Sequence, residues 1–209
     1  MLTIIDTKAG NFNSIINAFK RIGVDTILTD DVRKIKEARA LVLPGVAAFE
    51  KGMTGLNENN LADIIKSKVI EERTPIIGIC LGMQLLAENS EEHGRHKGLG
   101  LIKGNVVKLN PDNKDYKVPN IGWCDVSAKK EGVIFHGDYT TSSFYHVHSY
   151  HLQCANSNAV AASIEYGGGE VTVAIEQDNI FGVQFHPEKS QDAGLELLDR
   201  FAKYTNNIC

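Results

Sequence analysis

The sequence has no long hydrophobic run and no recognisable export segment. No apolar stretch approaches the roughly 20 residues that a membrane-spanning helix needs. The N-terminus lacks the basic segment followed by an apolar one that marks a signal peptide. We therefore expect a cytoplasmic protein that does not associate with a membrane.

Cysteine is scarce, with four residues at Cys80, Cys124, Cys154 and Cys209, and no CxxC pair. Disulfide frameworks are typical of short, cysteine-rich secreted chains, and zinc sites need closely spaced ligands. The sequence thus predicts reduced thiols, one of which can be reactive. The remaining candidate ligands, His93, His96 and His136, are expected in solvent-exposed segments or loops, so we predict no metal site.

The net charge is also small. The chain has 22 Lys and Arg residues and 26 Asp and Glu residues, for a net charge of -4. Nothing in this balance indicates nucleic acid or an anionic membrane surface as a partner. The 209 residues, 43% of them hydrophobic, are enough for one sizeable core. We expect residues 1–209 to form a single domain.

Strand and helix patterns alternate through the first half of the chain. Strands are predicted at 2–6, 24–28, 40–43 and 75–80, with helices at 60–72 and 83–88. Another helix is expected to begin at a cap on Asn13 or Ser14, to carry Ile15, Ile16, Phe19 and Ile22, and to end at Gly23. Such alternation predicts a parallel sheet covered by helices on both faces.

After about residue 98 the pattern changes to short β-like runs. They lie at 105–109, 122–126, 143–147, 160–165, 171–175 and 180–184, with a hairpin turn at 167–169 and a final helix at 194–204. We expect antiparallel hairpins added to the same sheet. The predicted fold class is therefore three-layer α/β, with a central mixed, mostly parallel sheet.

The sharpest local signal is the segment Gly-Ile-Cys-Leu-Gly at 78–82, between a predicted strand and a helix. This is the context of a nucleophile elbow, in which flanking glycines relieve crowding around a strained turn. Cys80 would project from the sheet edge, and the N–H of Leu81 could face a developing oxyanion. The helix N-terminus also favours a thiolate. A buried structural cysteine between packing glycines explains the segment equally well.

A second signal is Gln-Phe-His-Pro-Glu at 184–188, directly after a predicted strand. His186 is a suitable general base for a cysteine nucleophile, and Glu188 can hold its ring in one tautomer. In an extended segment positions i and i+2 face the same side, so both side chains can reach one cleft. Taken alone, an exposed loop with a chance His and Glu is the simpler explanation.

Together the two segments resemble the class I (triad) glutamine amidotransferases, in the same order and over essentially the whole chain. The resemblance implies a flavodoxin-like α/β fold and hydrolysis of L-glutamine to L-glutamate and ammonia. It implies that Cys80 attacks the glutamine amide and forms a thioester. His186 would move the protons and Glu188 would orient His186, without a metal or an organic cofactor.

Further segments resemble one branch of this family, the glutaminase subunits of imidazole glycerol phosphate synthase. They are 43–46, 88–92, 97–99, 104–107, 118–123, 147–150 and 189–190. The implied roles are oxyanion binding by the backbone of Val46 and Leu81, glutamine binding by Gln84, Glu92, His148, Ser149 and Tyr150, and partner contact by Asn11, Asn120, Trp123 and Lys189. The implied partner is a (βα)8-barrel cyclase, in a heterodimer that forms imidazole glycerol phosphate and aminoimidazole carboxamide ribotide. For Trp123 a plain core position is the alternative.

Several positions depart from that pattern. Ala47 stands where glycine is usual, Asn120 where histidine is common and Cys124 where asparagine is common, while His146 and His151 are unusual. These departures keep open a paralogous amidotransferase that supplies ammonia for amidination of a surface-polysaccharide sugar. The sequence is also compatible with a free-standing hydrolase or peptidase, and with a catalytically inactive regulatory subunit.

Overall fold

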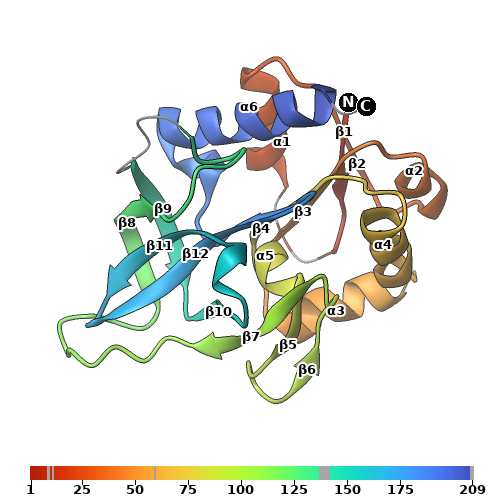
Figure 1. Ribbon diagram of the computed structural model, residues 1–209. Helices are drawn as coiled ribbons and strands as arrows, with labels where there is room; N and C mark the ends of the chain where they lie inside the picture. The colour runs from red at the N-terminus through yellow and green to blue at the C-terminus, as the bar shows by residue number, and fades with distance from the viewer. Residues whose placement is uncertain (9, 11, 59, 137–141, 208–209) are drawn as a thin grey trace.

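The computed structural model describes residues 1–8, 10, 12–58, 60–136 and 142–207 (Figure 1). A nine-stranded sheet runs through the middle of the molecule. Its strands, in spatial order, are β2 (Thr26–Thr29), β1 (Leu2–Ile5), β3 (Leu41–Gly45), β4 (Ile76–Cys80), β13 (Ile180–Val183), β12 (Gly169–Gln177), β11 (Val160–Tyr166), β8 (Asn120–Ala128) and β9 (Ser142–His148).

Pairing is parallel from β2 to β13 and antiparallel from β13 to β9. The mixed sheet is thus confirmed, with the parallel part built mainly from the first half of the chain. The last strand of that part, β13, comes from residues 180–183 and pairs with β4 at the centre. The two motifs at 78–82 and 184–188 therefore leave the sheet from adjacent parallel strands, at the same edge.

Helices cover both faces of this sheet, as predicted (Figure 1). They are α1 (Asn13–Arg21), α2 (Val32–Lys36), α3 (Phe49–Glu58), α4 (Leu61–Ile70), α5 (Leu81–Leu85) and α6 (Gln191–Asn207), with short 3-10 turns η1 (Ser157–Ala159) and η2 (Pro187–Lys189). Helices α1 and α6 pack on one face, where Phe19 and Leu197 join one apolar cluster. Helices α2 to α5 pack on the other face, around Phe49 and Leu56.

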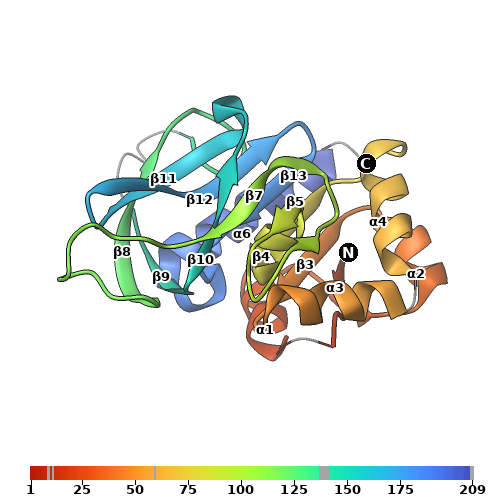
Figure 2. The same cartoon turned by 90° about the horizontal axis from the view of Figure 1, so that it is seen from below.

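The run at 105–109 does not join the main sheet, which corrects one prediction. It belongs to β7 (Ile102–Lys108), the centre of a separate four-stranded sheet with β10 (Tyr150–Cys154), β5 (Ala87–Ser90) and β6 (His96–Lys97). Figure 2 shows β5 and β7 lying across the main sheet near β4. Strand β7 buries Ile102 and Val106 in the same cluster as α5. The inward face of the small sheet is therefore occupied by the helix that follows the elbow.

The helix predicted at 83–88 is wrong in its second half. Helix α5 ends at Leu85, and β5 begins two residues later. The carbonyl oxygens of Leu85 and Leu86 accept hydrogen bonds from the N–H groups of Leu99, Leu101 and Ile102, rather than from a further helical turn. A contact between segments more than ten residues apart therefore ends this helix.

Two helices were not predicted, and one predicted cap is absent. Helix α3 contains two glycines, which lower its helix propensity. A Cβ at Gly55 would lie 2.2 Å from the carbonyl oxygen of Thr7, so only glycine allows this close approach. Helix α2 is only five residues long. Helix α1 has Phe12 at its N-cap position, in place of Asn13 or Ser14.

Candidate active site

Cys80 sits at the turn between the central strand β4 and helix α5. Its φ of 55° and ψ of -112° lie outside the ordinary regions for a residue with a side chain. The flanking glycine is required, because a Cβ at Gly82 would lie 1.6 Å from the carbonyl oxygen of Leu43. The structure therefore has the strained strand-turn-helix geometry of a nucleophile elbow. The simpler explanation, a cysteine in ordinary core packing, does not account for this backbone.

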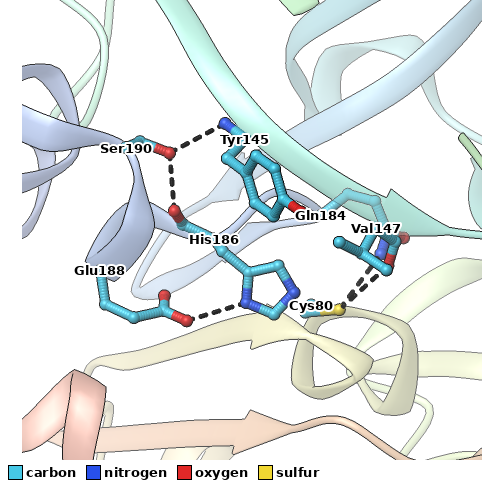
Figure 3. A network of polar contacts seen from close by, with 7 residues as sticks. All are labelled: Cys80, Tyr145, Val147, Gln184, His186, Glu188 and Ser190. Atoms are coloured by element: carbon cyan, nitrogen blue, oxygen red, sulfur yellow. Dashed lines mark hydrogen bonds and ion pairs between the residues drawn. The ribbon is translucent and has the colours of Figure 1, made fainter. Parts of the chain in front are cut away.

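His186 and Glu188 form a buried pair beside Cys80 (Figure 3). Nδ1 of His186 lies 2.8 Å from Oε1 of Glu188, and both side chains are at most 5% exposed. Figure 3 shows the other ring nitrogen turned toward the sulfur of Cys80. The alternative of an exposed loop is thereby wrong. Because a carboxylate accepts at Nδ1, Nε2 is left to exchange a proton with the thiol.

The main chain of His186 is held by β9. Its N–H donates to the carbonyl oxygen of Tyr145 over 2.9 Å. The hydroxyl of Ser190 donates to the His186 carbonyl oxygen over 2.6 Å and accepts from the Tyr145 N–H over 3.0 Å. These hydrogen bonds attach the segment after β13 to β9. They fix the backbone position from which the His186 side chain extends.

The electrostatics of His186 favour its charged form. Burial lowers the pKa of His186, but hydrogen bonds and charge interactions with Cys80 and Glu188 outweigh burial and raise the pKa to about 10. An imidazolium next to a cysteine stabilises the thiolate, which is the nucleophilic form of the side chain.

A cavity of about 480 Å³ opens in front of Cys80 and His186, a volume in the range of small-molecule sites. Its lining contains all five residues expected to bind glutamine, namely Gln84, Glu92, His148, Ser149 and Tyr150, together with Val46, Ala47, Leu81, Pro119, Val147 and Lys189. Glu188 stands behind His186 and does not line this cavity. The structure thus brings Cys80, His186 and the polar residues expected to bind glutamine together around one space.

The two residues expected to supply oxyanion donors come from two different segments beside Cys80. Leu81 is the first residue of α5, and Val46 follows the end of β3, where Gly45 pairs with Cys80. The Val46 side chain is 57% exposed. Both residues are close enough to Cys80 to border the same cavity, and their role stays a prediction.

Three of the departures noted in the sequence meet in one buried network. Nδ1 of His148 donates to the carbonyl oxygen of Tyr150 over 2.9 Å, so its Nε2 is an acceptor. This Nε2 lies 3.3 Å from Nδ1 of His146 and 3.4 Å from Nδ2 of Asn120, and Asn120 also contacts the thiol of Cys124. The network connects the β8–β9 hairpin to the cavity wall.

Both histidines of this network are held neutral. Burial lowers the pKa of His146 to about 3, and the nearby His148 and His186 act in the same direction. Burial also lowers the pKa of His148 to about 4, against the hydrogen bond to Tyr150. Nε2 of His146 is buried without a hydrogen-bond partner in the described part of the chain.

The residues expected at a partner interface differ from one another in their exposure to solvent. Trp123 is 49% exposed, so the alternative of a core position is wrong. Its ring packs against Tyr145 with centroids 6.0 Å apart, and Nζ of Lys189 lies 5.8 Å from the Tyr145 centroid. Asn120, by contrast, is only 4% exposed in this chain. Asn11 lies outside the described residues.

Comparison with known proteins identifies the family. The sequence pattern of the family described as glutamine amidotransferase class-I matches residues 3–204. The chain belongs to the class I glutamine amidotransferases. Relatives of this amidotransferase include imidazole glycerol phosphate synthase subunit HisH 2 of Methanococcus maripaludis, 45% identical over 97% of this chain and 99% of the relative. The subunit HisH of Sulfurimonas denitrificans is also 45% identical, over 99% of both chains.

Solved structures agree with this fold. The crystal structure of a glutamine amidotransferase superposes with a TM-score of 0.76 at 18% identity, over 98% of both chains. The PurLQS structure of Thermotoga maritima superposes with a TM-score of 0.72 at 19% identity, over 97% of both chains. At these identities the likeness concerns the fold alone.

Further expectations for this amidotransferase concern histidines and membranes. His93 and His136 are exposed, but His96 is half-buried in β6, which corrects the expected solvent-exposed or loop position. Among the described residues, no three histidine, cysteine or acidic side chains gather where they could hold a metal ion. In the same residues, no helix is both long and apolar enough to span a membrane.

Two residues of the site were present in the quoted motifs without a predicted role. Gln184 contacts the sulfur of Cys80, and Ser190 connects His186 to β9. Both adjoin the His-Pro-Glu segment in sequence, which is the signal that could have identified them. Their function depends on contacts with β4 and β9, which periodicity and spacing do not predict.

Proposed function

We propose that this amidotransferase is the glutaminase subunit of imidazole glycerol phosphate synthase. The observation that carries the proposal is the arrangement of Cys80, His186 and Glu188 around a cavity lined by five polar residues suited to glutamine. It is supported by curated HisH subunits that are 45% identical over nearly the full length of both chains. We infer that residues 1–209 act as one glutaminase domain, because strands from both ends of the chain share the central sheet.

The reaction follows from the proposed roles. His186 takes the thiol proton, and the Cys80 thiolate attacks the side-chain carbonyl carbon of glutamine. The backbone N–H groups of Leu81 and Val46 stabilise the oxyanion, and His186 returns the proton to the leaving ammonia as the C–N bond breaks. Water then hydrolyses the thioester, with His186 accepting its proton, and glutamate leaves.

We propose that the ammonia passes to a (βα)8-barrel cyclase subunit. Trp123, Tyr145 and Lys189 form what we call the rim cluster, an exposed aromatic and cationic surface beside the cavity. Exposed tryptophan is enriched at protein interfaces. A partner that covers the cavity mouth would also keep ammonia away from bulk water, where it is mostly protonated and not nucleophilic. Cytoplasm is the proposed compartment, because the catalytic thiol must stay reduced.

The test is glutamate release from glutamine, with and without the purified histidine-pathway cyclase and its nucleotide ligand. Strong stimulation by the cyclase is expected, together with irreversible labelling of Cys80 by a glutamine-mimicking chloroketone. Strong turnover without any partner would instead favour a free-standing hydrolase. A chain that is neither labelled nor stimulated would be a regulatory subunit.

One alternative keeps the same chemistry and changes the pathway. Asn120, Cys124 and His146 depart from the pattern of the histidine branch and contact one network behind the rim cluster. A changed network beneath the rim cluster fits a paralogue that supplies ammonia for amidination of a surface-polysaccharide sugar. Chloroketone labelling of Cys80 without stimulation by the cyclase would favour this alternative.

A further inference from the structure

The sulfur of Cys80 has two polar neighbours besides His186. It lies 4.0 Å from the carbonyl oxygen of Val147 in β9 and 3.9 Å from Nε2 of Gln184 (Figure 3). A carbonyl oxygen only accepts, so it can receive a hydrogen bond from the thiol. An amide NH2 only donates, so it serves the thiolate. The sulfur therefore has a partner in each of its protonation states.

The orientation of the Gln184 amide follows from a main-chain carbonyl. The carbonyl oxygen of Tyr150 accepts from Nε2 of Gln84 over 3.0 Å, which identifies that end of Gln84 as the NH2 group. The same Nε2 lies 2.9 Å from Gln184, so the Gln184 atom facing it must be the oxygen. A flipped Gln184 amide would place two donors against each other. Its NH2 group is consequently the end that faces Cys80.

Gln184 is also held rigidly in place. Its side chain is fully buried, and that of Gln84 is 6% exposed. Gln184 comes directly after β13, and its backbone N–H donates to the carbonyl oxygen of Val173 over 2.8 Å. A buried donor that is fixed before the reaction stabilises new charge without rearrangement, which is how preorganised sites lower barriers.

We propose that Gln184 is a catalytic hydrogen-bond donor to the sulfur of Cys80, oriented by Gln84. The proposal rests on the proposed role of Cys80 as the nucleophile. When the thiol proton moves to His186, the sulfur loses its bond to Val147 and keeps the one from Gln184. When the thioester is hydrolysed, the C–S bond breaks and its electron pair returns to the sulfur, which again accepts from Gln184. Gln184 itself transfers no proton.

The test measures how readily Cys80 ionises, without using glutamine. Gln184→Met keeps a side chain of similar length and removes the donor. The rate of Cys80 alkylation by iodoacetamide is followed against pH in the full chain, by mass spectrometry of the Cys80 peptide. We expect alkylation on the acid side of the midpoint to slow about tenfold, since a charged acceptor loses one hydrogen bond. The midpoint of the profile should move to higher pH while the alkaline plateau stays unchanged. An unchanged midpoint would overturn the proposal.

Two further variants make the comparison specific. Gln153→Met removes an exposed glutamine in β10 and should reproduce the wild-type profile. Gln84→Met leaves Gln184 in place but removes the group that orients its amide. It should move the midpoint in the same direction by a smaller amount, and a wild-type profile in this variant would contradict the orienting role.

A measurement on the wild-type chain covers the case in which Gln184→Met does not fold. The NMR signals of the Gln184 side-chain NH2 should shift with the same pH midpoint as Cys80 alkylation, and should lose that transition in Cys80→Ala. Signals that do not respond to Cys80 ionisation would refute the proposal. A Gln184-dependent alkylation profile in a chain that releases no glutamate, alone or with a partner, would refute the proposed function and leave the donor role standing.

Discussion

Buried histidines lie on two sides of the site, and their pKa values are shifted in opposite directions. His186 is 3% exposed and His146 is fully buried, so both are removed from water to a similar degree. The pKa of His186 is nevertheless raised to about 10, while the pKa values of His146 and His148 are lowered to about 3 and about 4.

The difference lies in their partners. His186 faces the carboxylate of Glu188 and the thiol of Cys80, whereas His146 and His148 face each other, an asparagine and a carbonyl oxygen. Burial alone removes the charge from a histidine, and an anion within hydrogen-bond distance restores it. His186 thus differs from His146 and His148 by its two acidic neighbours, the thiol of Cys80 and the carboxylate of Glu188.

The largest effect is expected when the proposed nucleophile or its proposed base is removed. Cys80→Ala and His186→Ala should each lower glutamine-dependent turnover by at least about a thousandfold, because the nucleophile or its base is lost. Partner binding and ammonia-dependent synthesis should persist in both variants. Steady-state kinetics with glutamine and with ammonium salts measure the two activities. Loss of partner binding in Cys80→Ala would refute the separation of glutamine hydrolysis from partner binding.

A milder change is to remove one of the two acidic groups that raise the pKa of His186. Glu188→Gln should lower the pKa of His186 and reduce turnover by about tenfold to a hundredfold, since the ring is still present but less well oriented. NMR titration of His186 and the pH dependence of kcat/KM measure these effects. The matched control is Glu165→Gln on the exposed end of β11, which should change neither quantity.

The free energy of unfolding should depend on pH in opposite ways for the two sets of histidines. The folded pKa of His146 lies below the usual 6.5, so its stabilising contribution is present above pH 6.5 and is lost as pH falls toward 3. By about pH 5 this loss is about 2 kcal/mol. The folded pKa of His186 lies above 6.5, so its contribution is present below that pH and is lost as pH rises toward 10.

Denaturant unfolding between mildly acidic and alkaline pH measures both contributions. His146→Phe should reduce the slope on the acid side of the stability profile, where His148 still contributes, and leave the alkaline side unchanged. Glu188→Gln should do the reverse. Equal acid slopes in wild type and His146→Phe would show that His146 is not held neutral in the folded chain.

The smallest expected effect concerns the outer face of the β8–β9 hairpin, opposite the buried histidines. Trp123→Ala should weaken binding of the proposed cyclase by about tenfold, because exposed tryptophans at interfaces contribute strongly to affinity. Titration calorimetry gives the dissociation constant. Tyr116→Ala, at another exposed aromatic residue 40% accessible to solvent, serves as the control and should bind normally.

The predictions that succeeded concern features that are local in sequence. The elbow at 78–82 needs only a strand, a strained residue between glycines and a helix start, all within a few residues. His186 and Glu188 are two positions apart and do meet at one site, but through the 3-10 turn Pro187–Lys189 rather than the extended segment expected. Likewise, the turn at Gly167 and Gly168 follows from two residues with positive φ between apolar runs.

The predictions that failed depend on contacts between distant segments. Helix α3 exists although it contains Gly52 and Gly55, because its packing against Thr7 and α5 outweighs its propensity. Helix α5 stops at Leu85 because the loop before β7 takes its last hydrogen bonds. The run at 105–109 pairs with β10 rather than with the main sheet, and no local pattern separates those two pairings.

The sequence by itself determined the chemistry, the order of the motifs and the mixed α/β class. Only the tertiary structure decided that His146 is neutral, that Asn120 faces inward while Trp123 faces outward, and that Gln184 directs its NH2 group at Cys80. The physical reason is the same in each case. The pKa of a side chain, its burial and the direction of its hydrogen bonds depend on what packs against it. Here the packing groups include segments that are far apart in the sequence, such as β4 and the segment after β13.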